Sequence, residues 1–380
     1  MKLLVLQEKL KEGLNVIERI VSKSLSLPVL NNVLIRADKN FLNLVATNLE
    51  IGINWWTLAK VEKKGEIAVP VSLLSGLSSL LPKKQISLQV EDSFLTVECD
   101  GFKTQIKGIS SEEFPIIPEV SKEDYIELDS AVFCRGLEQV TDIAVISQAR
   151  PEISGIYFSF FKNVIKIAAT DSFRLGEKTF FLEKIGSAPK VFDKEISFIL
   201  PQKTAREIIN IFGEKQGKIK IYFSPNQILL ESQMTETQHP QVQLVSRLIE
   251  GEYPGYQEII PKKWETKLIL PREEFLNQIR ISGLFSGRIN EVKIKVFPKE
   301  GKIEIFSQNP ELGENKSELF GKIEGKEVEV SFNFKFILEG LTHIKTKEVV
   351  FELNGLEGPA ILKPLGDESY LYVVMPIKAS

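Results

Sequence analysis

Internal repetition constrains the fold of this chain more than any single motif does. Three segments join a short strand to an amphipathic helix, at residues 1–21, 125–145 and 266–283. In each segment the apolar residues recur every three or four positions, which is the spacing of one buried helix face. A unit that returns at such long intervals is typical of a chain built from tandem copies of one supersecondary design.

A second strand and helix follow within each copy. The segments IAVPVSLLSGLSSLLP, SFILPQKTAREIINIFG and VEVSFNFKFILEGLTHI align on Pro70, Pro201 and Phe332, and both intervals are 131 residues. A proline at this place suits the first turn of a helix, where its missing N–H costs nothing. Alternating segments such as QISLQVEDSFLTVEC then indicate β-hairpins.

Proline-containing connectors separate the copies. SEEFPIIPEVSKEDY and GEYPGYQEIIPKKW each carry an aromatic–proline pair, and connectors of this kind are reasonable domain boundaries. We therefore predict three tandem, structurally similar α+β domains at residues 1–122, 123–253 and 254–380. Each domain is expected to contain two helices packed on antiparallel sheets. A chain of 380 residues is long enough for two or three such cores.

Composition and motifs favour a globular protein that is not an enzyme. No apolar run approaches the roughly 20 residues that a membrane helix needs. Cys99 and Cys134 have no paired spacing, which favours a reducing cytoplasm. The sequence contains no phosphate-loop, dinucleotide-binding or nucleophile-elbow motif. His239 and His343 lie far apart, each without a nearby cysteine or second histidine, so a zinc site is not expected.

The stretch AATDSFRLGE is the strongest candidate for a functional site. Asp171, Ser172 and Arg174 crowd into a turn after an apolar strand. One interpretation is turn chemistry, in which the Asp and Ser side chains satisfy nearby backbone groups. A second is a binding site, because this copy alone adds an aromatic residue, Phe173, beside a long cation. A third is an enzyme that uses Asp171 and Arg174, but nothing else in the sequence supplies a second catalytic group.

Five motifs together resemble the bacterial DNA polymerase III β subunit family, the sliding clamps. AATDSFRLG is similar to that family's A-T-D-G-H-R-L turn, and YVVMPIKAS is similar to its Y-[VL]-[VLI]-M-P-[MIVL]-[RK] ending. RPEISGIYF, SLPVLNNVLI and GEYPGYQEIIP resemble R-x-x-L-N-G-x-x-F, L-P-I-L-x-N and F-P-[DN]-Y-x-x-[IVL]-[IVL]-P. The matches keep their order and cover all three copies.

The resemblance implies a non-catalytic protein without a cofactor. Two subunits of that family pair head to tail into a ring that encircles double-stranded DNA without regard to its sequence. The ring acts as a processivity factor in DNA replication, because it tethers the DNA polymerase III catalytic subunit. The clamp loader and other proteins with a clamp-binding motif are further partners. The expectation is therefore a cytoplasmic homodimer that binds DNA and has no membrane association.

The family's peptide-binding pocket lies between the second and third domains, beside the C-terminal tail. Carried over residue by residue, its lining here would be Ile153, Thr170, Ser172, Phe173, Arg174, Leu175, Pro254, Ile259, Pro359, Val373, Val374, Met375, Pro376 and Ile377. Ser172 and Phe173 replace the usual glycine and histidine, and Glu258 stands where a basic residue is common. The resemblance thus implies a pocket with a bulkier and less positive rim.

DNA contact and ring closure are expected from further residues. The DNA-facing candidates are Lys23, Arg150, Lys203, Arg206, Arg280 and Lys335, whereas Ser72, Ser75 and Ser79 make the corresponding helix face of the first copy neutral. By position, the dimer-interface candidates are Ile106, Leu284 and Phe285. The alternative function is a monomeric, repeat-built interaction scaffold that never encloses DNA. Hydrodynamic size distinguishes the two.

Overall fold

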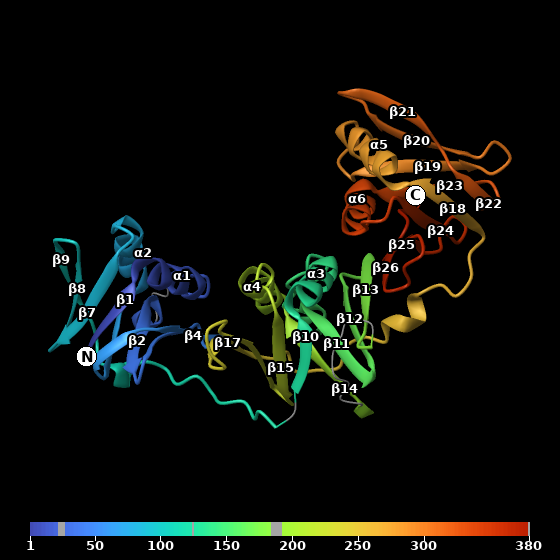
Figure 1. Ribbon diagram of the computed structural model, residues 1–380. Coiled ribbons are helices and arrows are strands. Elements are labelled where there is room, and N and C mark those ends of the chain that lie inside the picture. Colours follow the sequence, from blue (N-terminus) through green and yellow to red (C-terminus); the bar gives the residue numbers. More distant parts are fainter. Residues whose placement is uncertain (22–26, 124, 184–191, 379–380) are drawn as a thin grey trace. The chain divides into compact units, whose positions relative to one another are not determined.

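The computed structural model describes residues 1–21, 27–123, 125–183 and 192–378, so Lys23 lies outside the described residues. Three times along the described chain, a strand leads into a helix, further strands follow, and a second strand leads into a second helix (Figure 1). A group of antiparallel strands closes each copy. The predicted α+β class with three copies of one design is confirmed.

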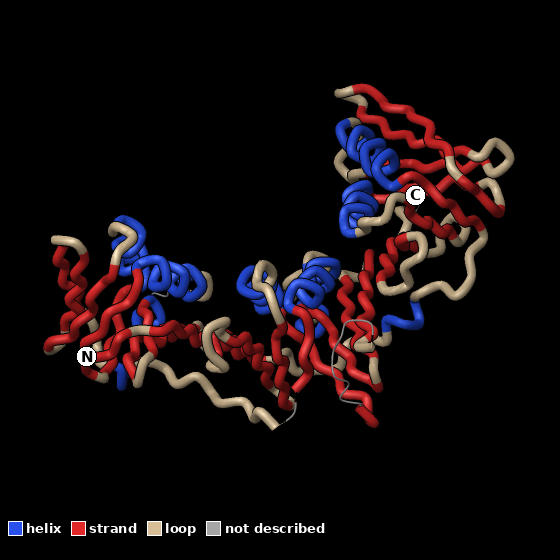
Figure 2. Tube along the Cα trace, viewed as in Figure 1, coloured by secondary structure: helices blue, strands red, loops and turns tan. Residues whose placement is uncertain are grey.

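The elements of the first copy are β1 (Lys2–Leu6), α1 (Gln7–Glu18), β2 (Asn32–Asp38), β3 (Phe41–Thr47), β4 (Ile51–Leu58), β5 (Lys60–Lys63), β6 (Gly65–Pro70), α2 (Val71–Leu80), β7 (Gln85–Glu91), β8 (Phe94–Cys99) and β9 (Phe102–Lys107). Helix α1 buries Leu10, Leu14 and Ile17 completely, as the apolar spacing predicts. Helices α1 and α2 lie side by side and cover one face of the strands (Figure 2).

The second copy contains β10 (Tyr125–Asp129), α3 (Ser130–Thr141), β11 (Gly155–Lys162), β12 (Val164–Thr170), β13 (Arg174–Phe181), β14 (Phe192–Pro201), α4 (Gln202–Phe212), β15 (Lys218–Ser224), β16 (Gln227–Gln233) and β17 (Pro240–Arg247). Phe133, Leu137 and Val140 on α3 are buried, so the stripe predicted for this helix is also confirmed.

The third copy contains β18 (Thr266–Pro271), α5 (Arg272–Leu284), β19 (Glu291–Phe297), β20 (Lys302–Asn309), β21 (Gly313–Phe320), β22 (Lys322–Gly325), β23 (Val328–Asn333), α6 (Phe334–His343), β24 (Glu348–Leu353), β25 (Ala360–Pro364) and β26 (Tyr370–Val374). Here the predicted alignment of the three copies, which matched Phe332 to Pro70 and Pro201, is wrong by one residue. Pro70 and Pro201 each end the strand before the helix, and the residue at that place in the third copy is Asn333. The Asn333 side chain caps α6 by accepting a hydrogen bond from the Lys335 N–H.

Four antiparallel sheets hold the described strands, and two of them cross from one copy into the next. The strand order is β5-β1-β7-β8-β9 in the first sheet, β10-β15-β16-β17-β4-β3-β2-β6 in the second, β14-β11-β12-β13-β26-β25-β24-β18-β22 in the third and β21-β20-β19-β23 in the fourth. The junctions between copies are therefore continuous backbone pairings, β17 with β4 and β13 with β26.

The chain forms two compact units, and the division passes through the second copy. The N-terminal unit contains Met1–Cys134 and Lys203–Leu248, whereas the C-terminal unit contains Arg135–Leu182, β14 and the chain from Ile249 onward. The first and second sheets belong to the N-terminal unit, and the third and fourth belong to the C-terminal unit. Each unit thus has its own junction between two copies.

Candidate functional site

The C-terminal tail is fixed by backbone hydrogen bonds in the C-terminal unit. Strand β26 pairs with β13 over five residues, from Arg174 opposite Val374 to Lys178 opposite Tyr370. The chain then continues, and the Met375 N–H donates to the Phe173 carbonyl at 2.8 Å. Two residues later the Ile377 N–H donates to the Ser331 carbonyl at 2.8 Å. These bonds hold the segment from Tyr370 to Ile377 against the second copy and against β23.

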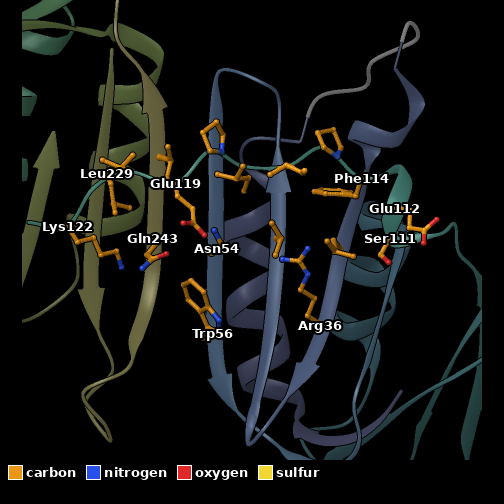
Figure 3. Close-up of a pocket in the computed structure, with 18 residues that line it drawn as sticks. Arg36, Asn54, Trp56, Ser111, Glu112, Phe114, Glu119, Lys122, Leu229 and Gln243 are labelled. Carbon is orange, nitrogen blue, oxygen red and sulfur yellow. The ribbon is translucent and has the colours of Figure 1, made fainter. Parts of the chain in front are cut away.

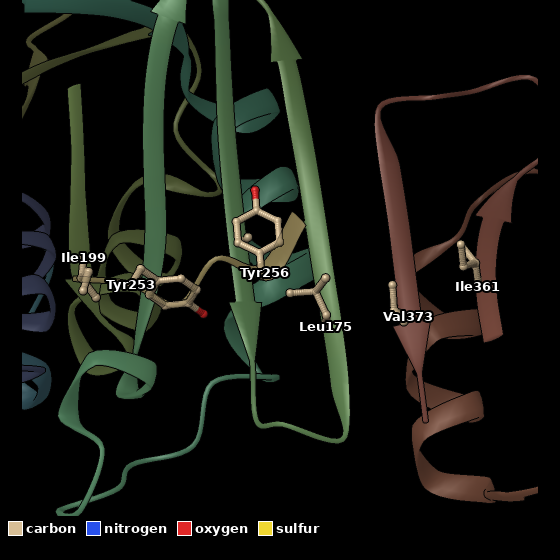
Figure 4. Packing of buried hydrophobic residues seen from close by; sticks show 7 residues of the cluster. Leu175, Ile199, Tyr253, Tyr256, Ile361 and Val373 are labelled. Atoms are coloured by element: carbon tan, nitrogen blue, oxygen red, sulfur yellow. The ribbon is translucent and has the colours of Figure 1, made fainter. Parts of the chain in front are cut away.

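A cluster of buried side chains lies under this junction. Leu175 on β13, Val373 on β26 and Ile361 on β25 pack with two tyrosines of the connector, Tyr253 and Tyr256 (Figure 4). Leu175, Val373 and Ile361 are each at most 2% exposed. The connector is therefore part of the core of the junction, and it holds the second and third copies together by burial of apolar surface.

The two tyrosine hydroxyl groups are both bonded. The Tyr253 hydroxyl accepts from the Thr170 N–H at 3.1 Å, and the Tyr256 hydroxyl donates to Glu177 at 2.6 Å. Burial raises the pKa of both phenols, and the neighbouring Glu177 raises that of Tyr256 further. Both therefore stay neutral hydrogen-bonding groups at physiological pH.

Turn chemistry shapes the segment Thr170–Arg174, as one of the sequence interpretations predicts. The Asp171 carboxylate accepts from the backbone N–H groups of Phe173 and Arg174, both at 3.0 Å. The Thr170 hydroxyl donates to the Arg174 carbonyl at 2.8 Å. Ser172 has a φ of 77°, which is the left-handed region that favours glycine. Ser172 thus occupies a backbone position that its own side chain disfavours.

Arg174 is occupied by contacts inside the unit. Its guanidinium donates to Asp171 at 2.9 Å and to Glu339 on α6. It also lies 4.6 Å from the centre of the Phe336 ring. The Arg174 side chain is 11% exposed, so most of its surface is covered. The structure places Arg174 between the turn and α6, where it joins the second copy to the third. Its role in lining a pocket stays a prediction.

The other predicted pocket residues divide by exposure. Phe173 is 62% exposed and Ile259 is 50% exposed. Ser172 is also exposed, whereas Pro254, Pro359, Met375 and Ile377 are partly buried. The buried members are Ile153, Thr170, Leu175, Val373, Val374 and Pro376. The C-terminal unit therefore contains the whole predicted set, and Phe173 and Ile259 offer the largest apolar surfaces to a ligand.

Tyr253, Tyr256 and Glu339 take part in this site and were not predicted. The tyrosines stand in the connector motif GEYPGYQEIIP, which was used for the domain boundary and the family resemblance but not for the site. Their aromatic side chains beside Pro254 were the available clue. Glu339 had no clue in the sequence, because its partner Arg174 is 165 residues away.

The DNA-facing candidates lie on exposed helix faces or loops wherever they are described. Lys203 and Arg206 are exposed on α4, Arg280 on α5 and Lys335 on α6. Arg150 donates to Glu152 at 3.3 Å and to the Ser172 hydroxyl at 3.2 Å. Ser75 on α2 was expected to share the open helix face with Ser72 and Ser79, and this expectation is wrong.

Ser75 is 7% exposed and donates to Glu18 at 2.7 Å, so it packs between α1 and α2. Leu73 and Leu80, at 53% and 87% exposed, occupy the open face of α2 together with Ser72 and Ser79. That face is uncharged, as expected, but it is more apolar than a row of serines would be.

The dimer-interface candidates differ in exposure. Ile106 on the edge strand β9 is 1% exposed, so its side chain belongs to the core of its own unit. Leu284 at the end of α5 is 70% exposed, and Phe285 is partly buried. Strand β9 ends the five-strand sheet and β21 ends the four-strand sheet, so each is the edge of its sheet among the described strands.

The histidine and cysteine side chains lie in packed or buried surroundings. His343 is largely buried, and burial lowers its pKa. His239 stacks on Phe41 with ring centres 4.1 Å apart. Cys99 and Cys134 are buried free thiols. In the described ranges, the acidic, histidine and cysteine side chains form no group of three that could hold a metal ion. No described helix has the length and apolar character to cross a membrane.

Comparison with known proteins identifies the architecture first. The crystal structure of the DNA polymerase sliding clamp from Bacillus subtilis superposes with a TM-score of 0.93 at 23% identity, covering 100% of both chains. A sliding clamp from Pseudomonas aeruginosa bound to griselimycin superposes with a TM-score of 0.91 at 21% identity, again over 100% of both chains. At these identities the likeness defines the fold, which is that of the three-domain clamps.

The sequence comparisons extend this to the family. Models of the DNA polymerase III beta subunit match residues 1–118 for the N-terminal domain, 127–255 for the central domain and 257–378 for the C-terminal domain. The beta sliding clamp of Synechococcus elongatus is 28% identical, covering 100% of this chain and 99% of that protein. That of Staphylococcus aureus is 27% identical over 95% and 94%. The chain belongs to the DNA polymerase III beta subunit family, the sliding clamps, which are non-catalytic processivity factors.

Proposed function

We propose that two copies of this chain close head to tail into a ring around duplex DNA and tether the replicative polymerase to it. The observation that carries this proposal is the strand count of the four sheets. In the nine-strand sheet, four strands of the second copy (β14-β11-β12-β13) continue into five strands of the third (β26-β25-β24-β18-β22). The sheet β23-β19-β20-β21 has four strands and β9-β8-β7-β1-β5 has five. Pairing of β21 with β9 of another copy would rebuild the same nine-strand sheet.

A second observation is the exposure of Phe102 on β9. The chain leaves β9, β17 and β26 in the same way, since Ile109, Ile249 and Ile377 each donate a backbone hydrogen bond to a carbonyl of the strand before the second helix. Phe102, Val242 and Tyr370 precede these three isoleucines by the same number of residues, so they occupy equivalent positions in the three strands.

Val242 and Tyr370 are at most 1% exposed at the two junctions within the chain, whereas Phe102 is 60% exposed. An exposed aromatic at a place where both equivalents are buried supports a covering partner. It also adds an exposed side chain on β9 to the residues proposed for the interface.

The charges of the two edges are complementary. The exposed charges are Lys103 and Lys107 on β9 and Glu314, Lys316 and Glu318 on β21, so the two strands carry net charges of opposite sign. An unprotected edge strand invites uncontrolled pairing, so a soluble clamp needs its edges covered in a defined register. Opposite charges facing each other across the paired strands would favour the heterologous contact of β9 with β21 over contacts of like edges.

DNA would be held without sequence readout. Lys203, Arg206, Arg280 and Lys335 place cations on exposed faces of three different helices, and such cations interact with phosphates at any sequence. The net charge of −3 argues against a tight grip, and weak, spread contacts are compatible with sliding. In this proposal the chain catalyses no reaction, needs no cofactor and works in the bacterial cytoplasm, where the DNA is replicated.

Partner proteins would dock at the junction of β13 and β26. The support is the group of apolar surfaces around Phe173, Ile259 and Met375, on a backbone that the tail and the tyrosine cluster make rigid. The polymerase, the clamp loader and other proteins with a clamp-binding motif would share this surface through short peptides. A Pseudomonas aeruginosa clamp binds griselimycin, so griselimycin is the probe that we propose for this surface.

The solution mass tests the ring directly. At micromolar concentration we expect twice the chain mass of 43.0 kDa for the natural protein. Replacement Phe102→Glu would place a charge in the interface and should shift the mass to that of one chain. Phe161→Glu, at a 44% exposed aromatic on β11, is the matched control and should leave the mass doubled. A monomer for the natural chain would favour the scaffold alternative.

A further inference from the structure

The junction within the N-terminal unit repeats the backbone of the junction that carries the proposed peptide site. The Thr47 hydroxyl donates to the Ile51 carbonyl at 3.0 Å, as Thr170 does to Arg174 at 2.8 Å. The Asn48 side chain accepts from the N–H groups of Glu50 and Ile51, as Asp171 does in the other turn.

The strands that leave the two junctions are also bonded alike. Arg247, which ends β17, donates its N–H to the Glu50 carbonyl at 3.0 Å, and Met375, which follows β26, donates to the Phe173 carbonyl at 2.8 Å. Leu49 and Ser172 even share a left-handed φ, at 73° and 77°. The same supporting backbone therefore occurs twice in the chain.

A hollow of about 690 Å³ lies beside the connector at this first junction, and we call it the linker hollow. The connector residues Phe114 and Val120 are buried against the outer face of the eight-strand sheet. Between them Ile116 is 92% exposed. The opposite wall is the sheet itself, where Trp56 and Asn54 on β4 and Gln243 on β17 line the space (Figure 3).

The charges around the linker hollow are unbalanced. Arg36 pairs with Glu66 at 2.8 Å, and Lys122 pairs with the buried Glu231 at 2.7 Å, so both cations of the lining are neutralised. Glu112 and Glu119 are exposed members of the lining and form no ion pair with any described residue. Figure 3 shows Glu119 extending from the connector toward Asn54. Two carboxylates without an ion-pair partner thus stand at the two sides of a hollow whose wall contains an indole ring.

We propose that the linker hollow is a second docking site, which binds an extended basic peptide segment of a partner protein. Lysine or arginine side chains of that segment would pair with Glu112 and Glu119, and an apolar side chain would cover Ile116 and the ring of Trp56. A cation over the indole face would add to the attraction. Asn54 offers an amide group to a peptide backbone, and Gln243, whose Nε2 already donates to Glu231 at 2.7 Å, keeps its carbonyl oxygen as an acceptor.

The negative charge of the hollow favours a basic peptide over nucleic acid, because the two uncompensated carboxylates repel phosphates. The hollow is bordered by connector residues on one side and by strand residues on the other, which suits an extended peptide segment laid between them. Each exposed ion pair contributes little, so the docking should be weak and sensitive to salt.

Fluorescence anisotropy with the full chain tests this proposal. The probe is a fluorescein-labelled pentapeptide in which lysines alternate with leucine and phenylalanine, and its counterpart carries glutamates in place of the lysines. The basic peptide should bind, and the acidic one should not. The double variant Glu112→Gln/Glu119→Gln should bind the basic probe about five-fold more weakly.

The matched control is Glu113→Gln/Glu123→Gln, which removes the same charge from exposed residues of the same connector that do not line the hollow. This control should stay within about two-fold of the natural chain, because the charge it removes lies outside the site. Equal weakening in both double variants would reduce the interaction to general attraction and overturn the site, as would absence of binding.

Apolar contact is tested by a second pair of variants. Ile116→Ser should weaken binding of the basic probe, whereas Leu80→Ser, at an 87% exposed residue of α2, should not. Both positions are exposed, so neither change should unfold the chain. Equal binding by Ile116→Ser and the natural chain would remove the apolar anchor from the proposal.

Phe173→Ala separates this site from the proposed peptide site at β13 and β26. It should leave binding of the basic probe unchanged, and a loss of binding in this variant would place the probe at the other junction. These measurements do not test the ring or its binding of DNA, because no variant changes β9, β21 or a cation proposed to face the DNA.

Discussion

Arg174 in the second copy donates to the carboxylate of Glu339 on α6 in the third copy, across 165 residues of sequence. Asp171 pairs with the same guanidinium, and Phe336 covers it. Burial raises the pKa of Glu339, although the Arg174 charge opposes the effect. Removal of one partner of this ion pair would therefore leave the other charge partly buried and unpaired, and that charge would no longer be compensated for the water it has lost.

Replacement Arg174→Ala should lower the free energy of unfolding by about 2 kcal/mol, because it leaves Asp171 and Glu339 partly buried without their cation. Arg174→Lys should lower it by less, since a lysine keeps the charge but loses the forked geometry. Urea denaturation measures both. Arg280→Ala, at an exposed arginine of α5, is the control and should change stability by less than about 0.5 kcal/mol. A loss no larger than in this control would contradict the role given to Arg174.

Ser172→Gly should make the chain more stable than Ser172→Ala by about 1 kcal/mol. Both variants lose the hydrogen bond from Arg150 to the Ser172 hydroxyl, so that contribution cancels between them. The difference that remains is the cost of a left-handed backbone at φ 77°, which glycine avoids and alanine does not. Thermal or urea unfolding of the two variants provides the comparison, and equal stability would show that the turn carries no such strain.

Phe173→Ala should weaken binding of griselimycin about ten-fold while leaving the stability of the chain unchanged. The side chain is 62% exposed, so it contributes little to folding but can bury a large apolar area against a ligand. Isothermal titration calorimetry and urea unfolding measure the two quantities. Phe161→Ala removes an exposed aromatic elsewhere in the same unit and should leave binding intact. Unchanged affinity in Phe173→Ala would remove this residue from the site.

Lys215 gives the N-terminal unit a dependence on pH. Its ammonium group donates to Gln241 at 2.8 Å near Glu12, and burial lowers its pKa to about 8. An unfolded lysine has a pKa of about 10.4. Between these values the unfolded chain binds the proton and the folded chain does not, so this residue raises the free energy of unfolding as pH rises from about 8 to 10.

The variant Lys215→Met lacks this titration. Its stability relative to the natural chain should therefore decline over the same interval of pH, because the natural chain gains stability and the variant does not. Urea denaturation at pH 7, 8, 9 and 10 follows the difference. A difference that stays constant over these pH values would show that the pKa of Lys215 is not lowered.

Local patterns in the sequence predict the local parts of this structure. The apolar spacing on α1 and α3 places Leu10, Leu14, Phe133 and Leu137 in the core, because helical periodicity requires no knowledge of the partner surface. The same holds for the Asp171 turn, where the side chain bonds its own neighbours. These contacts span only a few residues, so the residue types are sufficient to predict them.

Contacts between distant segments could not be predicted in this way. Nothing near Arg174 in the sequence indicates Glu339, and nothing near Phe102 indicates that its counterparts at two other places are buried. The alignment used Phe332 where the structure has Asn333, because a fixed interval between copies cannot reveal the insertion of one residue. Ile106 was chosen by its position along β9, but the alternation of the strand turns its side chain into the core. The domain boundaries and the roles of the pocket residues stay predictions.

Retention on circular DNA tests the central claim most directly. The protein is loaded onto a nicked circular duplex by a clamp loader, free protein is removed, and half of the sample is cut once with a restriction enzyme. We expect the protein to stay on the circles and to leave the linear molecules, with Phe102→Glu failing to stay on either. Equal retention on circular and linear DNA would contradict encirclement.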